Sequence, residues 1–296
     1  MLSDHIISHL QQQISQIQGH AASLTDAVPV AGGDINQAYR LHGTPKDYFV
    51  KLNQVHFQAM FAAEAKGLKE LVATATVRVP EALCCGVVEG QAYLVLEYLP
   101  LAGRVSGSER WLGQQLALLH AIEQPGFGWH LDNSIGSTPQ PNPFYQDWVA
   151  FWREQRLGFQ LKLAKAQGYG GKLQDSGQRL LEQLPVFFQD YRPQSALLHG
   201  DLWSGNQACL ADGTPVIFDP ACYYGDHEAD LAMMELFGRP GADFYAAYRE
   251  HLAIDAGFKI RKTLYNLYHI LNHLNLFGSG YQYQAERMID LLLAEA

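Results

Sequence analysis

A change of hydrophobic period near residue 100 constrains the fold of this chain more than any other feature. Between residues 28 and 97, short apolar runs are typical of strands, whereas beyond residue 108 apolar residues mostly recur every three or four positions, as in helices. The intervening segment 101–108, LAGRVSGS, is polar and rich in glycine and suits a connector. We therefore predict an α+β protein of two lobes, residues 1–100 and 101–296.

The first lobe is predicted to be an antiparallel sheet with one inserted helix. A helix over residues 4–18 carries one apolar stripe, formed by Ile7, Leu10, Ile14 and Ile17. Two hairpins of a meander follow, one turning at residues 43–46 and the other at Glu89-Gly90. Between the hairpins, residues 57–72 have the composition of a helix.

The second lobe is predicted to be larger and mostly helical. The expected helices span residues 108–123, 144–166, 172–190, 228–237, 242–252, 259–277 and 281–294. A single strand-like island, residues 196–220, interrupts them as a short strand, a loop and a hairpin turned at residues 211–214.

Charge and cysteine content exclude several classes of function. The 21 Lys and Arg residues against 30 Asp and Glu residues give a net charge of −9, which repels a phosphate backbone and disfavours nucleic-acid binding. No apolar run approaches the roughly 18 residues of a membrane span, and the N-terminus lacks the pattern of a signal peptide. The four cysteines are too few for a disulfide framework, so we expect a cytoplasmic protein without membrane contact.

The island contains the strongest chemical signal in the sequence. It reads HGDLWSGN over residues 199–206, followed by IFDP with Asp219. Phosphoryl transfer needs one carboxylate to orient the attacking hydroxyl and take its proton, which we assign to Asp201. It also needs oxygen ligands that hold Mg²⁺ against nucleotide phosphates, and Asn206 and Asp219 supply them.

Upstream residues complete the set expected of such an enzyme. Lys51 lies in the strand-like run YFVKLN, and Glu64 lies thirteen residues later on the predicted helix, so that an ion pair between them would aim the ammonium at phosphates. Gly32 and Gly33 precede the first predicted strand and allow backbone N–H groups to approach phosphate. Each feature alone also has an ordinary structural explanation, as an edge lysine or a turn. Their order along the chain favours the kinase interpretation.

Five segments give the sequence a resemblance to a known family. HGDLWSGN and IFDP resemble the small-molecule kinases that share the protein-kinase-like fold, among them aminoglycoside phosphotransferases and choline kinases. Trp203 and the segments 126–142, 144–157 and 219–233 resemble the fructosamine/ketosamine-3-kinases in particular. The resemblance implies a bilobal protein-kinase-like fold, ATP and Mg²⁺ as cofactors, and a hinge of Glu97, Tyr98 and Leu99 that faces adenine.

The implied function is ATP-dependent phosphorylation of a sugar hydroxyl, on the third carbon, of a ketosamine such as a fructosamine, ribulosamine or erythrulosamine adduct. The acceptor would be a small-molecule ketosamine or a glycated protein lysine, and the reaction would serve glycation repair. Two alternatives stay open, namely a kinase of an aminoglycoside, choline or another amino alcohol, and a nucleotide-binding protein without catalysis. The sequence leaves the oligomeric state undetermined.

Several residues have both a functional and a structural interpretation. Trp203 either forms a wall for the sugar ring or closes the loop by packing. The pair His269 and His273 lies four residues apart, a spacing that allows a shared metal but more commonly reflects packing.

The roles of three acidic residues and of one loop also have two interpretations. Asp226, Glu228 and Asp230 either attract a ketoamine ammonium or have structural roles; we expect Glu228 and Asp230 in the first turn of a helix, with Asp230 bracing the catalytic loop. The segment 126–142 either shapes the acceptor side of the site or orders its own loop, through Asn133, Thr138 and Gln140.

Overall fold

A computed structural model describes residues 2–31, 35–103 and 105–296 of the chain. The chain forms two compact units. Unit 1 comprises Met1–Ser108 together with Ala208–Asp219, and unit 2 comprises Glu109–Gln207 together with Pro220–Ala296. Part of the strand-like island predicted in the helical lobe therefore packs with the N-terminal sheet.

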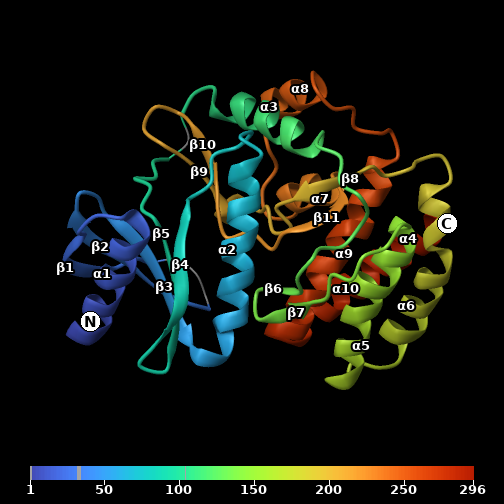
Figure 1. The fold of residues 1–296 in the computed structure, drawn as a ribbon. Helices are drawn as coiled ribbons and strands as arrows, with labels where there is room; N and C mark the ends of the chain where they lie inside the picture. The colour runs from blue at the N-terminus through green and yellow to red at the C-terminus, as the bar shows by residue number, and fades with distance from the viewer. Residues whose placement is uncertain (1, 32–34, 104) are drawn as a thin grey trace. The chain divides into compact units, whose positions relative to one another are not determined.

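Unit 1 is built on a five-stranded antiparallel sheet (Figure 1). Its strands, in spatial order, are β1 (Ser23–Pro29), β2 (Gln37–Thr44), β3 (Tyr48–Gln54), β5 (Gln91–Glu97) and β4 (Ala82–Val88). The predicted meander is wrong, because β5 rather than β4 pairs with β3. The reason is burial: the apolar run of β5 is buried along nearly all its length, whereas β4 is mostly half-buried and forms an edge.

The alternation of β3 directs its side chains to two differently covered faces. Val50 and Leu52 pack into one cluster with Leu10 and Ile14 of α1 (Asp4–Gln18). Ile6 is also in this buried stripe, whereas Ile17, which the sequence analysis placed in it, is 52% exposed. Lys51 therefore points to the opposite face, where α2 (Gln58–Ala73) packs on β4 and β5 and follows a short 3-10 helix, Val55–Phe57.

The distant segment of unit 1 is a hairpin of β9 (Gln207–Cys209) and β10 (Pro215–Ile217). Backbone hydrogen bonds attach this hairpin to the N-terminal part of the unit. The amide of Ile217 donates to the carbonyl of Arg78 over 3.0 Å, and the amide of Ala102 donates to the carbonyl of Cys209 over 2.7 Å. The strand that leads to Asp219 is thereby fixed beside the N-terminal sheet.

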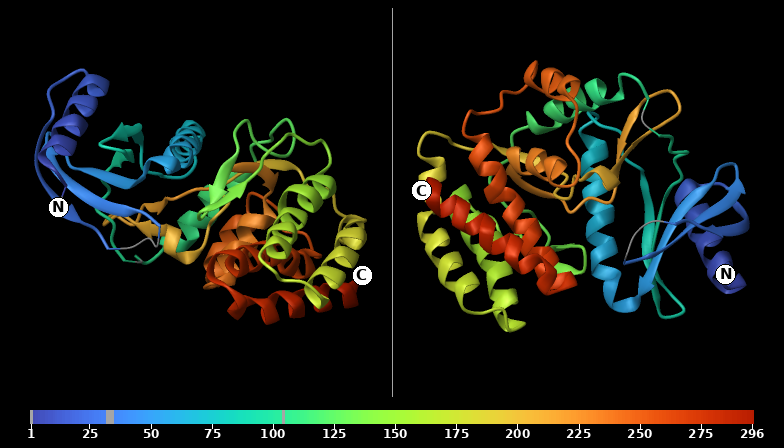
Figure 2. Two further views of the ribbon diagram at one scale, coloured as in Figure 1. Left: turned by 90° about the horizontal axis from the view of Figure 1, so that it is seen from below. Right: turned by 180° about the vertical axis from the view of Figure 1, so that it is seen from behind.

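Unit 2 is mostly helical, and all the predicted helices are present (Figure 2). The helices are α3 (Ser108–His120), α4 (Trp148–Phe151), a π-helix (Trp152–Leu157), α5 (Gly158–Ala166), α6 (Lys172–Gln183), α7 (Glu228–Leu236), α8 (Ala242–Arg249), α9 (Phe258–Phe277) and α10 (Gln282–Glu295). Short 3-10 helices span Leu184–Phe188, Ser204–Asn206 and Ser279–Tyr281. The long helix α9 packs against α5, α7 and α10 and forms the centre of the unit.

Unit 2 also contains strands that the sequence analysis missed. The strand β8 (Ser195–Leu198) is the short strand predicted at the start of the island, and it pairs with β11 (Tyr223–Asp226), which was not predicted. The strands β6 (Asn133–Ile135) and β7 (Thr138–Gln140), which pair with each other, were also not predicted. The island is therefore not the only strand region after residue 100. Strands of three or four residues are too short to show a period in the sequence.

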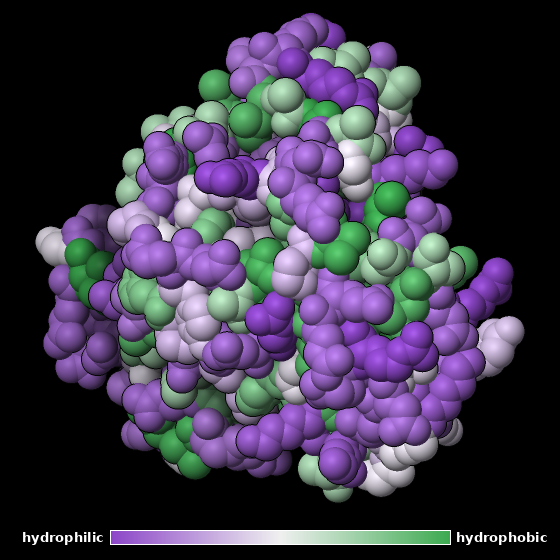
Figure 3. All heavy atoms as spheres, turned by 90° about the vertical axis from the view of Figure 1, so that its right-hand side faces the viewer, coloured by the Kyte–Doolittle hydropathy of each residue, from purple (hydrophilic) through white to green (hydrophobic). Residues whose placement is uncertain are grey.

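One face of the molecule, shown in Figure 3, has hydrophobic residues interspersed among hydrophilic ones. Within the described residues, no helix is long and apolar enough to cross a membrane.

Candidate active site

The side chain of Lys51 lies between two carboxylates of unit 1. Its Nζ donates to Oε1 of Glu64 and to Oδ1 of Asp219, each over 2.6 Å. Glu64 comes from α2, and Asp219 follows the hairpin of β9 and β10, so three distant parts of the sequence meet at one ammonium. The structure thus brings together three of the predicted site residues.

Burial and charge oppose each other at this ammonium. The side chains of Lys51 and Glu64 are 6% and 10% exposed, whereas that of Asp219 is 44% exposed. Burial alone would lower the pKa of Lys51, but the carboxylates of Asp219 and Glu64 outweigh it and hold that pKa above its ordinary value. Lys51 is therefore a fixed positive charge beside a solvent-accessible carboxylate.

The backbone of Asp219 adopts a left-handed conformation, with φ of 58°. This region of φ/ψ space is uncommon for a residue with a side chain, although aspartate tolerates it better than most. Such conformations gather at functional sites, where the surrounding structure enforces them.

The predicted hinge begins at the end of β5, which lies between β3 and β4 in the sheet of unit 1. The carboxylate of Glu97 accepts from Arg78 over 2.6 Å and from the amide of Glu81 over 3.2 Å. The guanidinium of Arg40 lies 4.3 Å from the ring centroid of Tyr98. The side chain of Glu97 thus has a structural partner, which leaves backbone groups of residues 97–99 as the candidates for contact with adenine.

The predicted glycine-rich turn lies only partly within the described residues. Gly32 and Gly33 are outside them. The prediction that this turn precedes the first strand is wrong, because β1 (Ser23–Pro29) comes before it and β2 after it. The sequence SLTDAVP of β1 is half-exposed to exposed throughout, so it lacks the alternation that marks a strand.

In unit 2, Asp201 and Asn206 contact each other across the loop HGDLWSGN. The side-chain nitrogen Nδ2 of Asn206 donates to the backbone carbonyl of Asp201 over 2.8 Å and to Oδ2 of Asp201 over 3.1 Å. Asn206 is buried and Asp201 is half-buried. Because the amide nitrogen is directed at Asp201, the amide oxygen of Asn206 is the atom available to a cation.

Asp230 holds the start of the loop HGDLWSGN through hydrogen bonds to its backbone. Its Oδ2 accepts from the amide of His199 over 2.7 Å, and its Oδ1 accepts from the amide of Gly200 over 2.9 Å. Burial alone would raise the pKa of Asp230, but hydrogen bonding to His120 and to these amides lowers it below its ordinary value. The expected bracing role of Asp230, in the first turn of α7, agrees with this geometry.

His120 is a residue that the sequence analysis missed. Its Nε2 lies 3.3 Å from Oδ2 of Asp230, and its Nδ1 lies 2.8 Å from the hydroxyl of Tyr248. All three side chains are buried. No local pattern identifies His120, because it lies 110 residues before its partner.

Gly200 is required by a close backbone approach. Its φ is +81°, and a Cβ at this position would lie 2.1 Å from the carbonyl oxygen of Ala221. The amide of Ala221 also donates to the carbonyl of His199 over 2.8 Å. The loop that carries Asp201 is therefore bound to the chain two residues after Asp219.

Trp203 is partly exposed and lies beside aromatic and glycine residues. Its side chain is 38% exposed, and its ring makes an edge contact with Phe237 at a centroid distance of 6.2 Å. A Cβ on Gly205 would lie 2.2 Å from the Trp203 ring, so the indole packs over this glycine. One side of Trp203 is packed, as the structural interpretation expects, while exposed surface remains for an acceptor.

The segment 126–142 is ordered by its own buried polar groups. Asn133 donates to the carbonyl of Cys222 over 2.8 Å, and Gln140 donates to the carbonyl of Ala221 over 3.1 Å. The hydroxyl of Tyr268 donates to the amide oxygen of Gln140 over 2.7 Å, and Thr138 is buried in the β6–β7 pair. These contacts support the loop-ordering interpretation of Asn133, Thr138 and Gln140.

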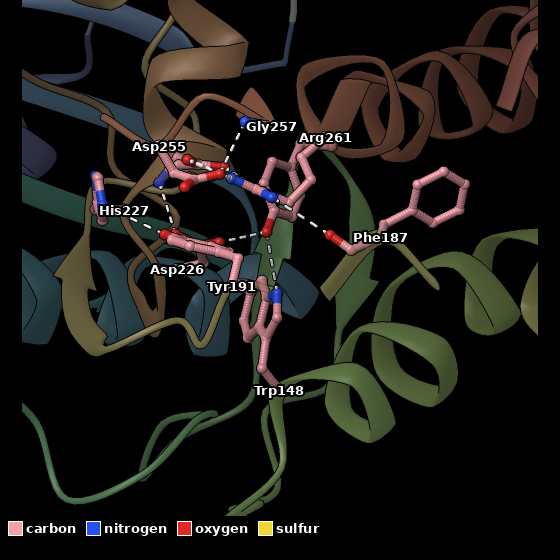
Figure 4. A network of polar contacts seen from close by, with 10 residues as sticks. Trp148, Phe187, Tyr191, Asp226, His227, Asp255, Gly257 and Arg261 are labelled. Carbon is pink, nitrogen blue, oxygen red and sulfur yellow. Dashed lines mark hydrogen bonds and ion pairs between the residues drawn. The ribbon is translucent and has the colours of Figure 1, made fainter. Parts of the chain in front are cut away.

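The acidic residues Asp226 and Glu228 are fully buried and cannot meet an acceptor amine. Figure 4 shows the polar network that contains Asp226 and Arg261. Asp226 accepts from the hydroxyls of Tyr191, over 2.9 Å, and Tyr265. Glu228 accepts from Arg261 over 2.7 Å and 3.0 Å. Burial raises the pKa of both carboxyls, to about 7 for Glu228, and their role is to join α7, α9 and β11.

The two histidines of α9 give no sign of a metal site. His269 is buried, and burial lowers its pKa to about 3, which keeps the imidazole neutral. Among the residues that the structure describes, no group of three or more His, Cys, Asp or Glu side chains could hold a metal ion. A packing role fits His269, and His273 lies among aromatic rings.

Comparison with solved structures identifies the class of protein. An aminoglycoside phosphotransferase, at 16% identity, superimposes with a TM-score of 0.61 over 96% of this chain and 98% of its own. A candidate fructosamine-3-kinase from Haemophilus somnus, at 28% identity, superimposes with a TM-score of 0.87 over 96% of each chain. The fold is therefore the bilobal kinase-like fold that the sequence predicted, with an antiparallel sheet in one unit and helices in the other.

Sequence relatives narrow this class to one family. A probable ketoamine kinase of Synechocystis is 49% identical over 96% of both chains. The chloroplastic protein-ribulosamine 3-kinase of Arabidopsis thaliana is 42% identical over 92% of this chain and 84% of its own. The model of the fructosamine kinase family matches residues 6–295, and the chain belongs to this family of kinases.

Proposed function

We propose that this kinase transfers the γ-phosphoryl group of ATP to a sugar hydroxyl of a ketosamine, with Asp201 as the base. The observation that carries the proposal is the pair of contacts at Lys51, which place a buried ammonium between Glu64 and the exposed carboxylate of Asp219. A lysine anchored in this way by a helix glutamate is the phosphate-binding device of kinases. Membership of the fructosamine kinase family supports the acceptor class.

Each residue has a defined task in this reaction. Lys51 would bind nucleotide phosphates, because Glu64 fixes its position from the buried side. The contacts of Asp201 with Asn206, and those of the preceding residues with Asp230, hold the loop before substrate arrives. Asp201 would accept the proton of the attacking hydroxyl as its oxygen bonds to phosphorus.

The donor set suits magnesium. Asp219 offers a half-exposed carboxylate, and Asn206 offers an amide oxygen whose nitrogen is already hydrogen-bonded. Mg²⁺ in phosphoryl transfer is commonly bound by one or two protein oxygens, with phosphate and water completing its coordination. When bound, the ion would neutralise charge that develops on the phosphates.

The acceptor hydroxyl is proposed to be that on the third carbon, since the Arabidopsis relative is named a protein-ribulosamine 3-kinase. Small ketosamines and glycated protein lysines are both proposed acceptors, in a glycation-repair reaction. Trp203 is proposed to contact the sugar, since it stands two residues after Asp201 with its ring partly exposed. A cytoplasmic location and the absence of a nucleic-acid partner stay predictions.

The test is an ADP-release assay with ATP and Mg²⁺ across fructosamine, ribulosamine and erythrulosamine adducts. Aminoglycosides and choline are the controls, because solved relatives of 16% identity share the fold alone. We expect turnover with at least one ketoamine and product phosphorylated at the third carbon, located by NMR. Turnover restricted to choline or an aminoglycoside would replace the proposed acceptor.

A further inference from the structure

A row of contacting aromatic rings extends from Trp203 across unit 2. Trp203 contacts Phe237 at a centroid distance of 6.2 Å, and Phe237 contacts His273 at 5.3 Å. His273 in turn contacts Phe277 at 5.5 Å and Tyr281 at 5.2 Å. We call these five residues the aromatic rim.

The aromatic rim is exposed to an extent that packing does not explain. Trp203, Phe237 and Phe277 are 38%, 41% and 59% exposed. Single exposed apolar residues are normal on protein surfaces, but a contiguous group of exposed rings marks an interaction site. Burying these rings against an apolar partner would release the water that covers them.

The rim is continuous with the loop that carries the proposed base. Trp203 lies two residues after Asp201, and the hydroxyl of Ser204 donates to the carbonyl of Phe237 over 3.0 Å. An acceptor sugar bound at Asp201 must project its amine substituent away from the reacting hydroxyl. The rim is thus an apolar surface that starts where the sugar is expected to lie.

The aromatic rim has no positive charge that would attract an anionic partner. Burial lowers the pKa of His273, so its imidazole is neutral at pH 7. Its Nδ1 has no hydrogen-bond partner within the part of the chain that the structure describes. Aromatic ring faces carry partial negative charge, so they favour aliphatic groups and ammonium groups over carboxylates.

We infer that the aromatic rim binds the amine-bearing part of the acceptor, namely the aliphatic side chain of a glycated lysine and apolar neighbours in its polypeptide. This inference rests on the proposed function, and it makes the rim the determinant of selectivity between peptide-borne and small ketoamines. Phe277, the last residue of α9, is more exposed than Phe237, the other phenylalanine of the rim.

The test compares two ketoamines that share one ribulose sugar. One adduct is on glycine, and the other is on a lysine flanked by leucines in a short peptide. We expect the wild-type KM for the peptide to be about tenfold lower than for the glycine adduct. Phe277→Ala should raise the KM for the peptide by about five- to tenfold and leave the KM values for the glycine adduct and ATP unchanged. Phe237→Ala should raise the KM for the peptide by a similar factor.

The matched control is Tyr283→Ala, because Tyr283 is 75% exposed on α10 and lies outside the aromatic rim. This variant should leave both acceptor KM values unchanged, and melting curves should show all three variants folded. Equal wild-type KM values for the two adducts, or equal effects of Phe277→Ala on both, would overturn the inference. Absence of turnover with every ketoamine would instead overturn the proposed function beneath it.

A second copy of the chain is the rival occupant of the rim. Sedimentation of wild type and Phe277→Ala distinguishes the two cases. A wild-type dimer that the substitution dissociates, with acceptor KM values unchanged, would overturn the inference and assign the rim to self-association.

Discussion

Removing the ammonium of Lys51 should have two separable effects, one on stability and one on catalysis. In Lys51→Met, the carboxyl of Glu64 loses its 2.6 Å partner in a position only 10% exposed, where burial already raises its pKa. Breaking a buried ion pair from one side costs about 3–5 kcal/mol, because an unpaired charge stays buried. Asp219 is 44% exposed, so water screens it and it adds little to this cost.

The double variant Lys51→Met/Glu64→Gln removes that unpaired charge. We expect it to recover most of the lost free energy of unfolding, since a neutral amide is far less costly to bury than a carboxylate. It should not recover catalysis, because the ammonium proposed to bind phosphate is still missing. Loss of one such preorganised group lowers turnover by about 10²–10³-fold.

The assay pairs urea unfolding with ADP release for wild type, the single variant and the double variant. Lys66→Met and Lys69→Met are the controls, because both lysines are exposed on the same helix as Glu64. Their free energies of unfolding should change by less than about 0.5 kcal/mol. Recovery of turnover in the double variant, or equal losses at all three lysines, would refute the phosphate-binding role of Lys51.

Three further predictions concern the base, the metal and buried histidine. Asp201→Asn should keep ATP affinity but lower turnover by about 10²–10⁴-fold, and near-normal turnover would remove the base assignment. Asp219→Ala should abolish the strengthening of ATP binding by Mg²⁺ in titration calorimetry; an unchanged Mg²⁺ effect would assign the metal to another residue. Burial lowers the pKa of His269 to about 3 in the folded protein, whereas an unfolded histidine has a pKa of about 6.5. The neutral imidazole therefore costs no stability above about pH 6.5. Below that pH the free energy of unfolding falls by about 1.4 kcal/mol per pH unit until the pH approaches about 3. His269→Gln should therefore flatten the loss of stability between pH 6 and 5, whereas exposed His251→Gln should not; equal slopes in both would contradict the prediction.

The parts of the fold that the sequence predicted are those where one segment decides its own structure. The helix 259–277 shows a clear 3.6-residue period, and its α9 counterpart spans Phe258–Phe277. Strand order in the sheet escaped prediction, because it depends on which hairpin strand is buried on both faces. The runs of β4 and β5 are both apolar in sequence, yet only β5 is buried along nearly all its length.

The site residues that the sequence predicted are likewise those within one short motif, and the contacts it missed join distant segments. A compact motif such as HGDLWSGN identifies Asp201 and Asn206, and their contact follows from a spacing of five residues. The burial of Glu228 could not be predicted, because its partner Arg261 lies 33 residues away. The aromatic rim was missed for the same reason, since its rings come from the loop HGDLWSGN, the residue that follows α7 and the region of α9 and α10.

Unit 1 is formed by two segments that lie far apart in the sequence, and this sets an order of events during synthesis. The ribosome completes residues 1–108 about a hundred residues before the β9–β10 hairpin that belongs to the same unit. Until that hairpin emerges, the carbonyl of Arg78 lacks the amide of Ile217, and Lys51 has Glu64 without Asp219. The N-terminal unit therefore reaches its final packing only after most of the chain has been translated, and Lys51 acquires its second carboxylate at that late stage.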